Sequence, residues 1–176
     1  DSTVDSLGHV PLSVIHPPDN PFPESRPDVP WSETVILEAH VRGWTKLHPE
    51  VPAEHRGTYL GMAHPAVIEH LKRIGVTAVE LLPVTSIADE PGLLHRGVTN
   101  YWGYATLGFL APHAGYASVP GAETTEFREM VAAPRRGHRG DPGPGAQPHR
   151  GGRGQRHHAL LSRPRRPVLL LAGRQR

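Results

Sequence analysis

The chain has 176 residues, enough for one ordinary domain, and it contains no cysteine, which excludes disulfides and thiolate metal sites. Its net charge of +2 is the sum of two unlike parts. Residues 1–133 hold 8 Lys and Arg against 16 Asp and Glu, whereas residues 134–176 hold 11 Arg and a single acid, Asp141. The overall charge therefore says little about partners, and the change near Pro134 indicates a boundary.

The distribution of apolar residues predicts neither a membrane span nor a signal peptide. No apolar run approaches the roughly 20 residues of a membrane span. The first residues also lack a basic segment followed by an apolar stretch, so they do not look like a signal peptide. We therefore expect a cytoplasmic location and no membrane partner, with which the absence of cysteine agrees.

The first third of the chain predicts a linker, a strand and a loop. Residues 1–31 are rich in Pro, Asp and Ser, and the stretch from His16 to Pro30 has no periodicity, which is typical of an extended linker. The apolar and β-branched run from Thr34 to Val41 predicts a strand buried on both faces. Residues 43–63 are predicted to form a loop.

A helix and a second strand follow. Pro65 fits the first turn of a helix, where its missing N–H costs nothing, and Gly75 is a typical stop. Apolar residues recur between them at helical spacing, at Val67, Ile68, Leu71 and Ile74. Residues 76–84 predict a second buried strand. A strand, helix and strand in this order form a βαβ unit, so the two strands should be parallel neighbours.

The remainder predicts a long loop, a second helix and an irregular tail. Residues 85–121 carry most of the aromatic side chains and are predicted to be a loop. A helix should begin near Glu123, with Phe127, Met130 and Val131 on one face. The residues after Pro134 are so rich in Pro and Gly that neither helix nor strand is predicted there.

Several motifs together resemble bacterial glycogen-debranching enzymes, the isoamylase-like branch of the α-amylase superfamily of glycoside hydrolases. They occur in order between about Asp5 and Ala133: Val35-Ile-Leu-Glu-Ala-His-Val-Arg-Gly43, Arg56-Gly-Thr-Tyr59, His64-Pro-Ala-Val-Ile-Glu-His-Leu-Lys72, Gly75-Val-Thr-Ala-Val-Glu-Leu-Leu-Pro-Val84, and Asn100-Tyr-Trp-Gly-Tyr104 followed by Leu107-Gly-Phe-Leu-Ala-Pro112.

The resemblance implies an α/β fold that is an incomplete (β/α)8 TIM barrel. Residues 1–31 would be a linker that follows a missing N-terminal β-domain. Residues 32–133 would hold the first two barrel strands with their helices, and residues 134–176 would be a disordered tail. An open barrel edge of this kind predicts a weakly stable or aggregating product.

The resemblance also implies a chemistry and a partner. The family hydrolyses α-1,6 branch links in glycogen and limit dextrins with a pair of carboxyl groups, and needs no cofactor or metal. Those carboxyls come from strands 4 and 5, so no catalytic residue is assigned here and the chain is expected to be inactive. Tyr104 matches the tyrosine that stacks on a sugar of the α-glucan; Trp102 and Tyr101 belong to the same motif. The alternative interpretation is that these three rings do not bind sugar and instead anchor the loop by packing on the barrel rim.

The tail is interpreted as an out-of-frame translation. Suppose that each codon from Gly137 onward joins the last base of one true codon to the first two bases of the next. The amino-acid sequence in the restored frame is then Gly-Ile-Glu-Val-Ile-Leu-Asp, three undetermined residues, and Asn-His-Thr-Ala-Glu-Gly. This resembles the third barrel strand of the family, which is missing at the expected place. The sequence alone does not separate a biological shift from a technical one.

Other interpretations of the tail and of the chain stay open. An Arg-rich segment can neutralise phosphate, but without interleaved aromatic residues we do not expect a nucleic-acid partner. The tail histidines are not expected to bind a metal, and His40 is predicted to be a hydrogen-bonded core residue. The alternative functions are a non-catalytic remnant with weak glucan or nucleic-acid binding, and a fragment of a trehalose-releasing relative.

Overall fold

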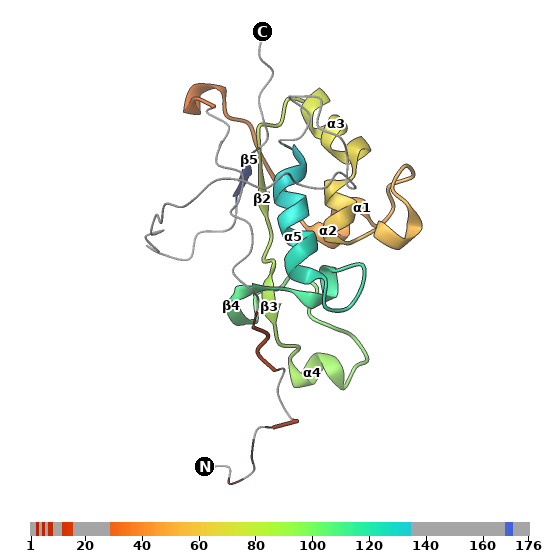
Figure 1. Ribbon diagram of the computed structural model, residues 1–176, viewed down its shortest axis with the longest axis vertical. Coiled ribbons are helices and arrows are strands. Elements are labelled where there is room, and N and C mark those ends of the chain that lie inside the picture. Colours follow the sequence, from red (N-terminus) through yellow and green to blue (C-terminus); the bar gives the residue numbers. More distant parts are fainter. Residues whose placement is uncertain are drawn as a thin grey trace, which may run out of the picture.

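The structure is a computed structural model that describes residues 3, 5, 7–8, 12–15 and 29–134, together with the backbone of residues 168–170. The predicted linker between His16 and Pro30 falls almost entirely outside the described residues. So does most of the Arg-rich tail. The described residues form an α/β arrangement with two small sheets and helices beside them (Figure 1).

The predicted βαβ unit is confirmed. Strand β1 (Ile36–Ala39) pairs in parallel with β2 (Ala78–Leu81), with Ile36 opposite Ala78 and Ala39 opposite Leu81. Helix α3 (Pro65–Arg73) connects them. His64 caps its first turn and Gly75, at a φ of 84°, follows its end, as the sequence predicts.

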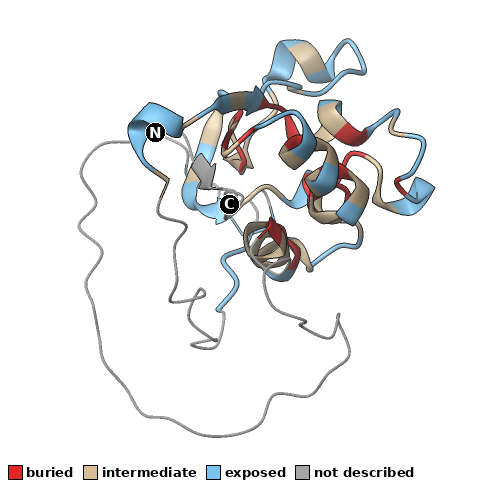
Figure 2. Ribbon diagram, turned by 90° about the horizontal axis from the view of Figure 1, so that it is seen from above, coloured by how far each residue is buried: buried red, intermediate tan, exposed pale blue. Residues whose placement is uncertain are grey.

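Strand β1 is covered on one face, which corrects the prediction that the first strand is buried on both faces, whereas β2 is buried at Ala78, Val79 and Leu81. Leu37, Ala39, Val79 and Leu81 face the core that lies under the helices. Ile36, on the opposite face of β1, is 49% exposed. One reason is that β1 is an edge strand, since among the described residues β2 is the strand that pairs with it. Figure 2 shows the buried residues gathered toward the inside of the fold.

The predicted loop over residues 43–63 contains helical turns instead. Helix α1 (Val41–Thr45) starts directly after β1, and a short 3-10 helix, η2 (Ala53–His55), precedes helix α2 (Tyr59–Ala63). Thr58 caps α2 by accepting a hydrogen bond from the Gly61 N–H at 3.2 Å. Tyr59 and Met62 place α2 in the core, so tertiary packing stabilises a helix too short for its sequence pattern to reveal.

The predicted loop over residues 85–121 also contains regular structure. Strands β3 (Thr85–Ile87) and β4 (Thr106–Pro112) form a separate antiparallel pair with two irregularities in register. Helix α4 (Pro91–Leu94) and the 3-10 helix η3 (Ala114–Tyr116) lie on either side of β4 in the chain. Another 3-10 helix, η1 (Trp31–Glu33), precedes β1.

Helix α5 (Glu123–Ala132) confirms the second predicted helix. Met130 is fully buried, and Phe127 and Val131 pack against the core beside it. Figure 1 shows α5, α2 and α3 along the same side of β2. These helices therefore form one layer and the β1–β2 pair forms the other.

The backbone of three residues in the tail forms a strand, which differs from the prediction for that segment. Strand β5 (Val168–Leu170) pairs antiparallel with β2, with Leu169 opposite Val79. An unpaired strand edge exposes a row of backbone donors and acceptors, and pairing satisfies them. The order of the sheet is β1-β2-β5.

Candidate functional site

The candidate site lies where β1 and β2 end. A hydrogen bond from the Leu82 N–H to the Ala39 carbonyl at 2.9 Å ties the two carboxyl ends together. The chain turns into α1 after β1 and into β3 after β2, so the connections that follow both strands gather at one edge. In parallel α/β sheets this edge is where ligands bind, because the loops there are free to carry function.

The loop over residues 100–104 is held at its start by carboxylates. Asp89 accepts a hydrogen bond from the Asn100 N–H at 2.6 Å, and Glu90 accepts two from the Asn100 amide at 3.0 and 3.2 Å. The side-chain oxygen of Asn100 in turn accepts from the Gly103 N–H at 2.8 Å. Asn100 therefore closes the turn that presents the three aromatic residues.

The other end of this loop is packed directly on Pro83, two residues after the end of β2. Gly103 has a φ of 80°, and a Cβ atom there would lie 2.9 Å from the carbonyl oxygen of Pro83. Only glycine meets both conditions without strain. The Tyr-Trp-Gly-Tyr motif thus needs its glycine for a close approach of backbone to backbone.

His40 joins the start of α1 to the middle of the same loop. Its Nδ1 atom accepts hydrogen bonds from the N–H groups of Arg42 and Gly43, each at 3.1 Å. The ring proton therefore lies on Nε2, which donates to the Tyr101 carbonyl oxygen at 2.6 Å. The prediction that His40 is a hydrogen-bonded core residue is confirmed, since its side chain is only 8% exposed.

A hollow of about 240 Å³ lies beside His40 and the loop. It is lined by His40, Arg42, Ile87, Asp89, Thr99, Asn100, Tyr101, His113, Gly115 and Tyr116. Most of these side chains are polar or aromatic. Asp89 is the one carboxylate among the lining residues, whereas retaining glycoside hydrolysis uses two carboxyls about 5–5.5 Å apart. The hollow can hold a polar ligand, but its lining does not supply that pair.

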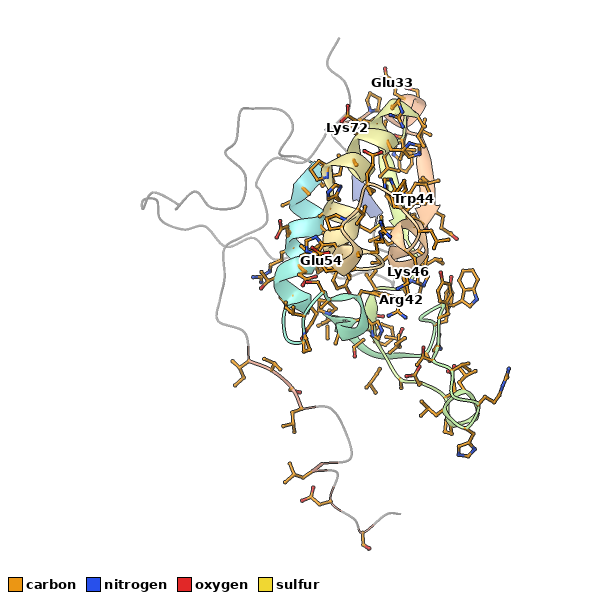
Figure 3. The ribbon with its side chains drawn as sticks, turned by 90° about the vertical axis from the view of Figure 1, so that its right-hand side faces the viewer. Glu33, Arg42, Trp44, Lys46, Glu54 and Lys72 are labelled. Atoms are coloured by element: carbon orange, nitrogen blue, oxygen red, sulfur yellow. The ribbon has the colours of Figure 1, made fainter. Side chains whose placement is uncertain are left out.

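The far wall of the hollow is braced by Arg42, which lies at the end of α1 nearest the loops that follow β2 (Figure 3). Its guanidinium donates to the Gly115 carbonyl at 2.9 Å and lies 5.8 Å from the centre of the Tyr116 ring. Burial lowers the pKa of both His40 and His113, and the charge of Arg42 acts in the same direction. Burial also raises the pKa of Tyr116. Neutral rings therefore line this wall.

The three predicted sugar-binding residues do not form one group. Tyr101 lines the hollow and is 46% exposed, and its ring lies edge to face with that of Trp102, at 5.7 Å between centres. Tyr104 and Trp102 are each 57% exposed and are not among the lining residues. All three rings thus offer surface to solvent, but only Tyr101 borders the hollow.

Several residues of this region were not singled out from the sequence. Arg42, His113 and Tyr116 have partners 50 or more residues away, so no local pattern marks them. Asn100 could have been recognised as a turn residue, because Asn side chains often bond nearby backbone N–H groups. In the described part of the chain no cluster of three or more His, Asp or Glu could hold a metal ion. No helix there is long and apolar enough to cross a membrane.

Comparison with known proteins gives matches over part of the chain. No family model matches. The chain is 51% identical over 131 residues to the glycogen operon protein GlgX homolog of Mycobacterium tuberculosis, covering 73% of this chain and 18% of that protein. It is 49% identical over 110 residues to the glycogen debranching enzyme of Salmonella paratyphi B, covering 62% of this chain and 17% of that enzyme.

Comparison with solved structures also finds similar enzymes, which are pullulanases. The pullulanase of Anoxybacillus sp. LM18-11 complexed with maltotetraose matches with a TM-score of 0.53 and 25% identity, over 67% of this chain and 19% of that one. Pullulanase type I of Bacillus subtilis complexed with maltose matches with a TM-score of 0.51 and 25% identity, over 70% and 19%. The chain spans less than a fifth of each of these proteins. Over that part, the resemblance to glycogen-debranching enzymes is confirmed.

Proposed function

We propose that residues 32–133 are the start of the catalytic domain of an enzyme that hydrolyses α-1,6-glucosidic branch links in glycogen and limit dextrins. The observation that carries this proposal is the 51% identity over 131 residues to a GlgX homolog. The matched length is close to the 133 residues that precede the change in charge and composition. A cytoplasmic location is part of the same proposal, since glycogen is stored there.

The proposed architecture is the opening of a (β/α)8 barrel. Parallel β1 and β2, with α3 between them and the helices on one face, have the arrangement of two successive barrel strands. The uncovered face, which includes the half-exposed Ile36, would be the barrel interior, filled in a complete barrel by the facing strands. We propose the residues before 32 as a linker and those from 134 as an out-of-frame tail.

The proposed partner is an α-glucan, and the proposed contact is the aromatic loop. Tyr104, Trp102 and Tyr101 present half-exposed rings, and aromatic faces suit the apolar faces of pyranose rings. The turn closed by Asn100 and Gly103 fixes their backbone before any ligand arrives. A preformed loop of this kind binds with a lower ordering cost than a free one.

Hydrolysis by this chain is not expected. The hollow beside the loop offers the carboxylate of Asp89 alone, and that carboxylate already accepts the Asn100 N–H. The proposed role of the chain as it stands is therefore weak glucan binding, without turnover. No cofactor or metal takes part in this proposal.

Calorimetric titration with maltotetraose tests the proposal, with release of reducing ends from glycogen measured in parallel. We expect saturable binding in the millimolar range or tighter and no reducing-end release. Tyr104→Ala should abolish the binding. Phe109→Ala is the matched control, because Phe109 is a 70% exposed aromatic residue of β4 outside the loop over residues 100–104. Equal binding by both variants, or none by the unmodified chain, contradicts the proposal.

A further inference from the structure

We propose that His40 is a positioning residue for glucan binding, which holds the aromatic loop in the orientation that a sugar meets. The inference rests on the proposed function of that loop. It assigns to the end of β1 a part in binding, although His40 lies 61 residues before Tyr101 in the sequence. The residues that carry it lie on three segments that are far apart in the sequence: residues 40–43, residues 100–104 and η3.

Both nitrogens of His40 have hydrogen-bond partners in the backbone of different segments, and Nε2 also lies 3.2 Å from the Tyr116 hydroxyl of η3. Nδ1 accepts from the first N–H groups of α1, and Nε2 donates to the carbonyl of Tyr101, 61 residues later. The 2.6 Å distance of the second bond is at the short end for N–H to O contacts. A single imidazole thus couples the end of the first strand to the middle of the loop.

The ring of His40 also packs on the aromatic side chains. It lies flat on the Tyr101 ring, with centres 4.2 Å apart and planes 2° from parallel. Trp102 approaches it edge to face at 6.3 Å, and Tyr116 closes the other side at 5.6 Å. Two of the three proposed sugar-binding rings therefore take their orientation from His40. Gly43 makes room for this, since a Cβ there would lie 2.6 Å from the Tyr101 hydroxyl.

The loop has separate anchors at its two ends, so His40 acts on the part between them. Asp89 and Glu90 hold Asn100, and Pro83 lies against Gly103. The Tyr101 carbonyl, between these anchors, accepts its hydrogen bond from His40. Without His40, the backbone of the loop should keep its overall path, but the Tyr101 and Trp102 rings should lose their fixed orientation. Binding that depends on preorganised aromatic faces then weakens, although no sugar contact has been removed.

Two substitutions separate the roles of the two nitrogens. The amide oxygen of Asn takes the place of Nδ1, so His40→Asn keeps the helix cap and loses the bond to Tyr101. The longer Gln reaches toward Tyr101, so His40→Gln keeps a donor for that carbonyl and loses the cap. His70→Asn, at a half-buried position of α3 where His70 contacts Arg73 and Trp44, is the control for removing a histidine.

Hydrogen exchange of the amides in residues 100–104 and titration with maltotetraose are measured for each variant. We expect His40→Asn to exchange faster in this loop and to bind about two- to tenfold more weakly, the effect of one hydrogen bond, with a smaller loss of melting temperature than His40→Gln, which also loses the helix cap. His40→Gln should restore loop protection and affinity relative to His40→Asn, despite a lower melting temperature. If His40 had a purely structural role, the affinity for maltotetraose would instead fall in proportion to the loss of melting temperature in both variants.

The outcomes keep this inference apart from the proposed function. If the unmodified chain binds maltotetraose and His40→Asn binds equally well with unchanged loop exchange, His40 is not a positioning residue. If affinity falls only in step with melting temperature, the inference is also overturned. If the unmodified chain does not bind, the proposed function itself is wrong, and the glucan role of His40 falls with it.

Discussion

The hydroxyl of Tyr59 lies 3.0 Å from the carbonyl oxygen of His113 and 3.3 Å from that of Val84, so one side chain of α2 reaches the backbone of both strands at one end of the β3–β4 pair, beside the Thr85–Pro112 pairing. The Tyr59 ring is completely buried, and its edge-to-face neighbours are Tyr116 and Phe127. A residue of a five-residue helix thus connects the helical layer to the segment that follows the candidate site. Burial of its hydroxyl raises the pKa of Tyr59 far above its ordinary value.

Removing only this hydroxyl should cost little, and removing the ring should cost much. Both carbonyls also accept a backbone N–H, so Tyr59→Phe is expected to lower the free energy of unfolding by about 0.5–1.5 kcal/mol. Tyr59→Ala should lower it by about 3–5 kcal/mol, because it leaves a cavity in the core. Urea denaturation measures both. Leu47→Ala, at a 90% exposed position, should change stability by less than about 0.5 kcal/mol.

The contact between Gly103 and Pro83 predicts a second pair of variants. Gly103→Ala combines a positive φ with a clash against a backbone carbonyl. Gly97→Ala is matched to it, since Gly97 has a φ of 68° and open space where a Cβ would lie. The control should lose about 1–2 kcal/mol from backbone strain alone, and Gly103→Ala should lose more. Equal losses in thermal unfolding would show that the approach to Pro83 is unimportant.

Gly61 predicts a more severe effect within α2. A Cβ there would overlap the carbonyl oxygen of His55 and lie 2.8 Å from the Thr45 hydroxyl. That hydroxyl already accepts the Gly57 N–H, so it is not free to move away. Gly61→Ala is therefore expected to displace α2 and abolish cooperative unfolding, as followed by near-ultraviolet circular dichroism. Gly92→Ala in α4, with open space around it, should unfold like the unmodified chain.

The two histidines beside the hollow predict a loss of stability in mild acid. Burial lowers the pKa of His40 and His113 in the folded chain relative to an unfolded value near 6.5. The unfolded state therefore binds protons first as the pH falls through about 6.5, and stability decreases from there downward. Above that pH their contribution is complete. Melting temperatures between about pH 8 and pH 5 check this, and a melting temperature that rises toward pH 5 is the opposite result.

The pairing of β5 with β2 predicts an effect on self-association. Removal of residues 168–176 should leave the β2 edge unpaired, and exposed strand edges pair with other chains. We expect the shortened chain to sediment as larger species at concentrations where the 176-residue chain does not. Unchanged sedimentation would mean that β5 does not protect this edge.

The sequence predicted those elements whose signals are local. Pro65 and Gly75 mark both ends of α3, and apolar runs mark β1 and β2, so the βαβ unit was accessible from the sequence. Helix α2 was missed because it has five residues with a glycine in the middle, and its stability comes from Thr58 and Tyr59. Strands β3 and β4 were missed because their pairing is short and irregular in register.

The candidate site was predictable only in part, because some of its residues have a local sequence signal and others are brought together by long-range contacts. The motif ending in Tyr104 identified the loop, and its glycine has a structural cause in the contact with Pro83. The hydrogen bond of His40 joins residues 61 positions apart, and that of Arg42 joins residues 73 apart. Such pairings are set by the topology of the chain and leave no trace in the local sequence. The full burial of β1 was mispredicted because burial depends on elements that pack from outside the strand.

The most direct test of the whole account is to map where maltotetraose binds. In a ¹⁵N-labelled sample titrated with the sugar, we predict saturable shifts of the amide signals of residues 100–104 and of the residues after His40, with little change at the outer edge of β1. In the Tyr104→Ala variant, adding maltotetraose should cause no shift of these amide signals. Shifts confined to other parts of the chain, or identical shifts in the variant, would contradict the claim that this loop is a glucan-binding element of a debranching enzyme.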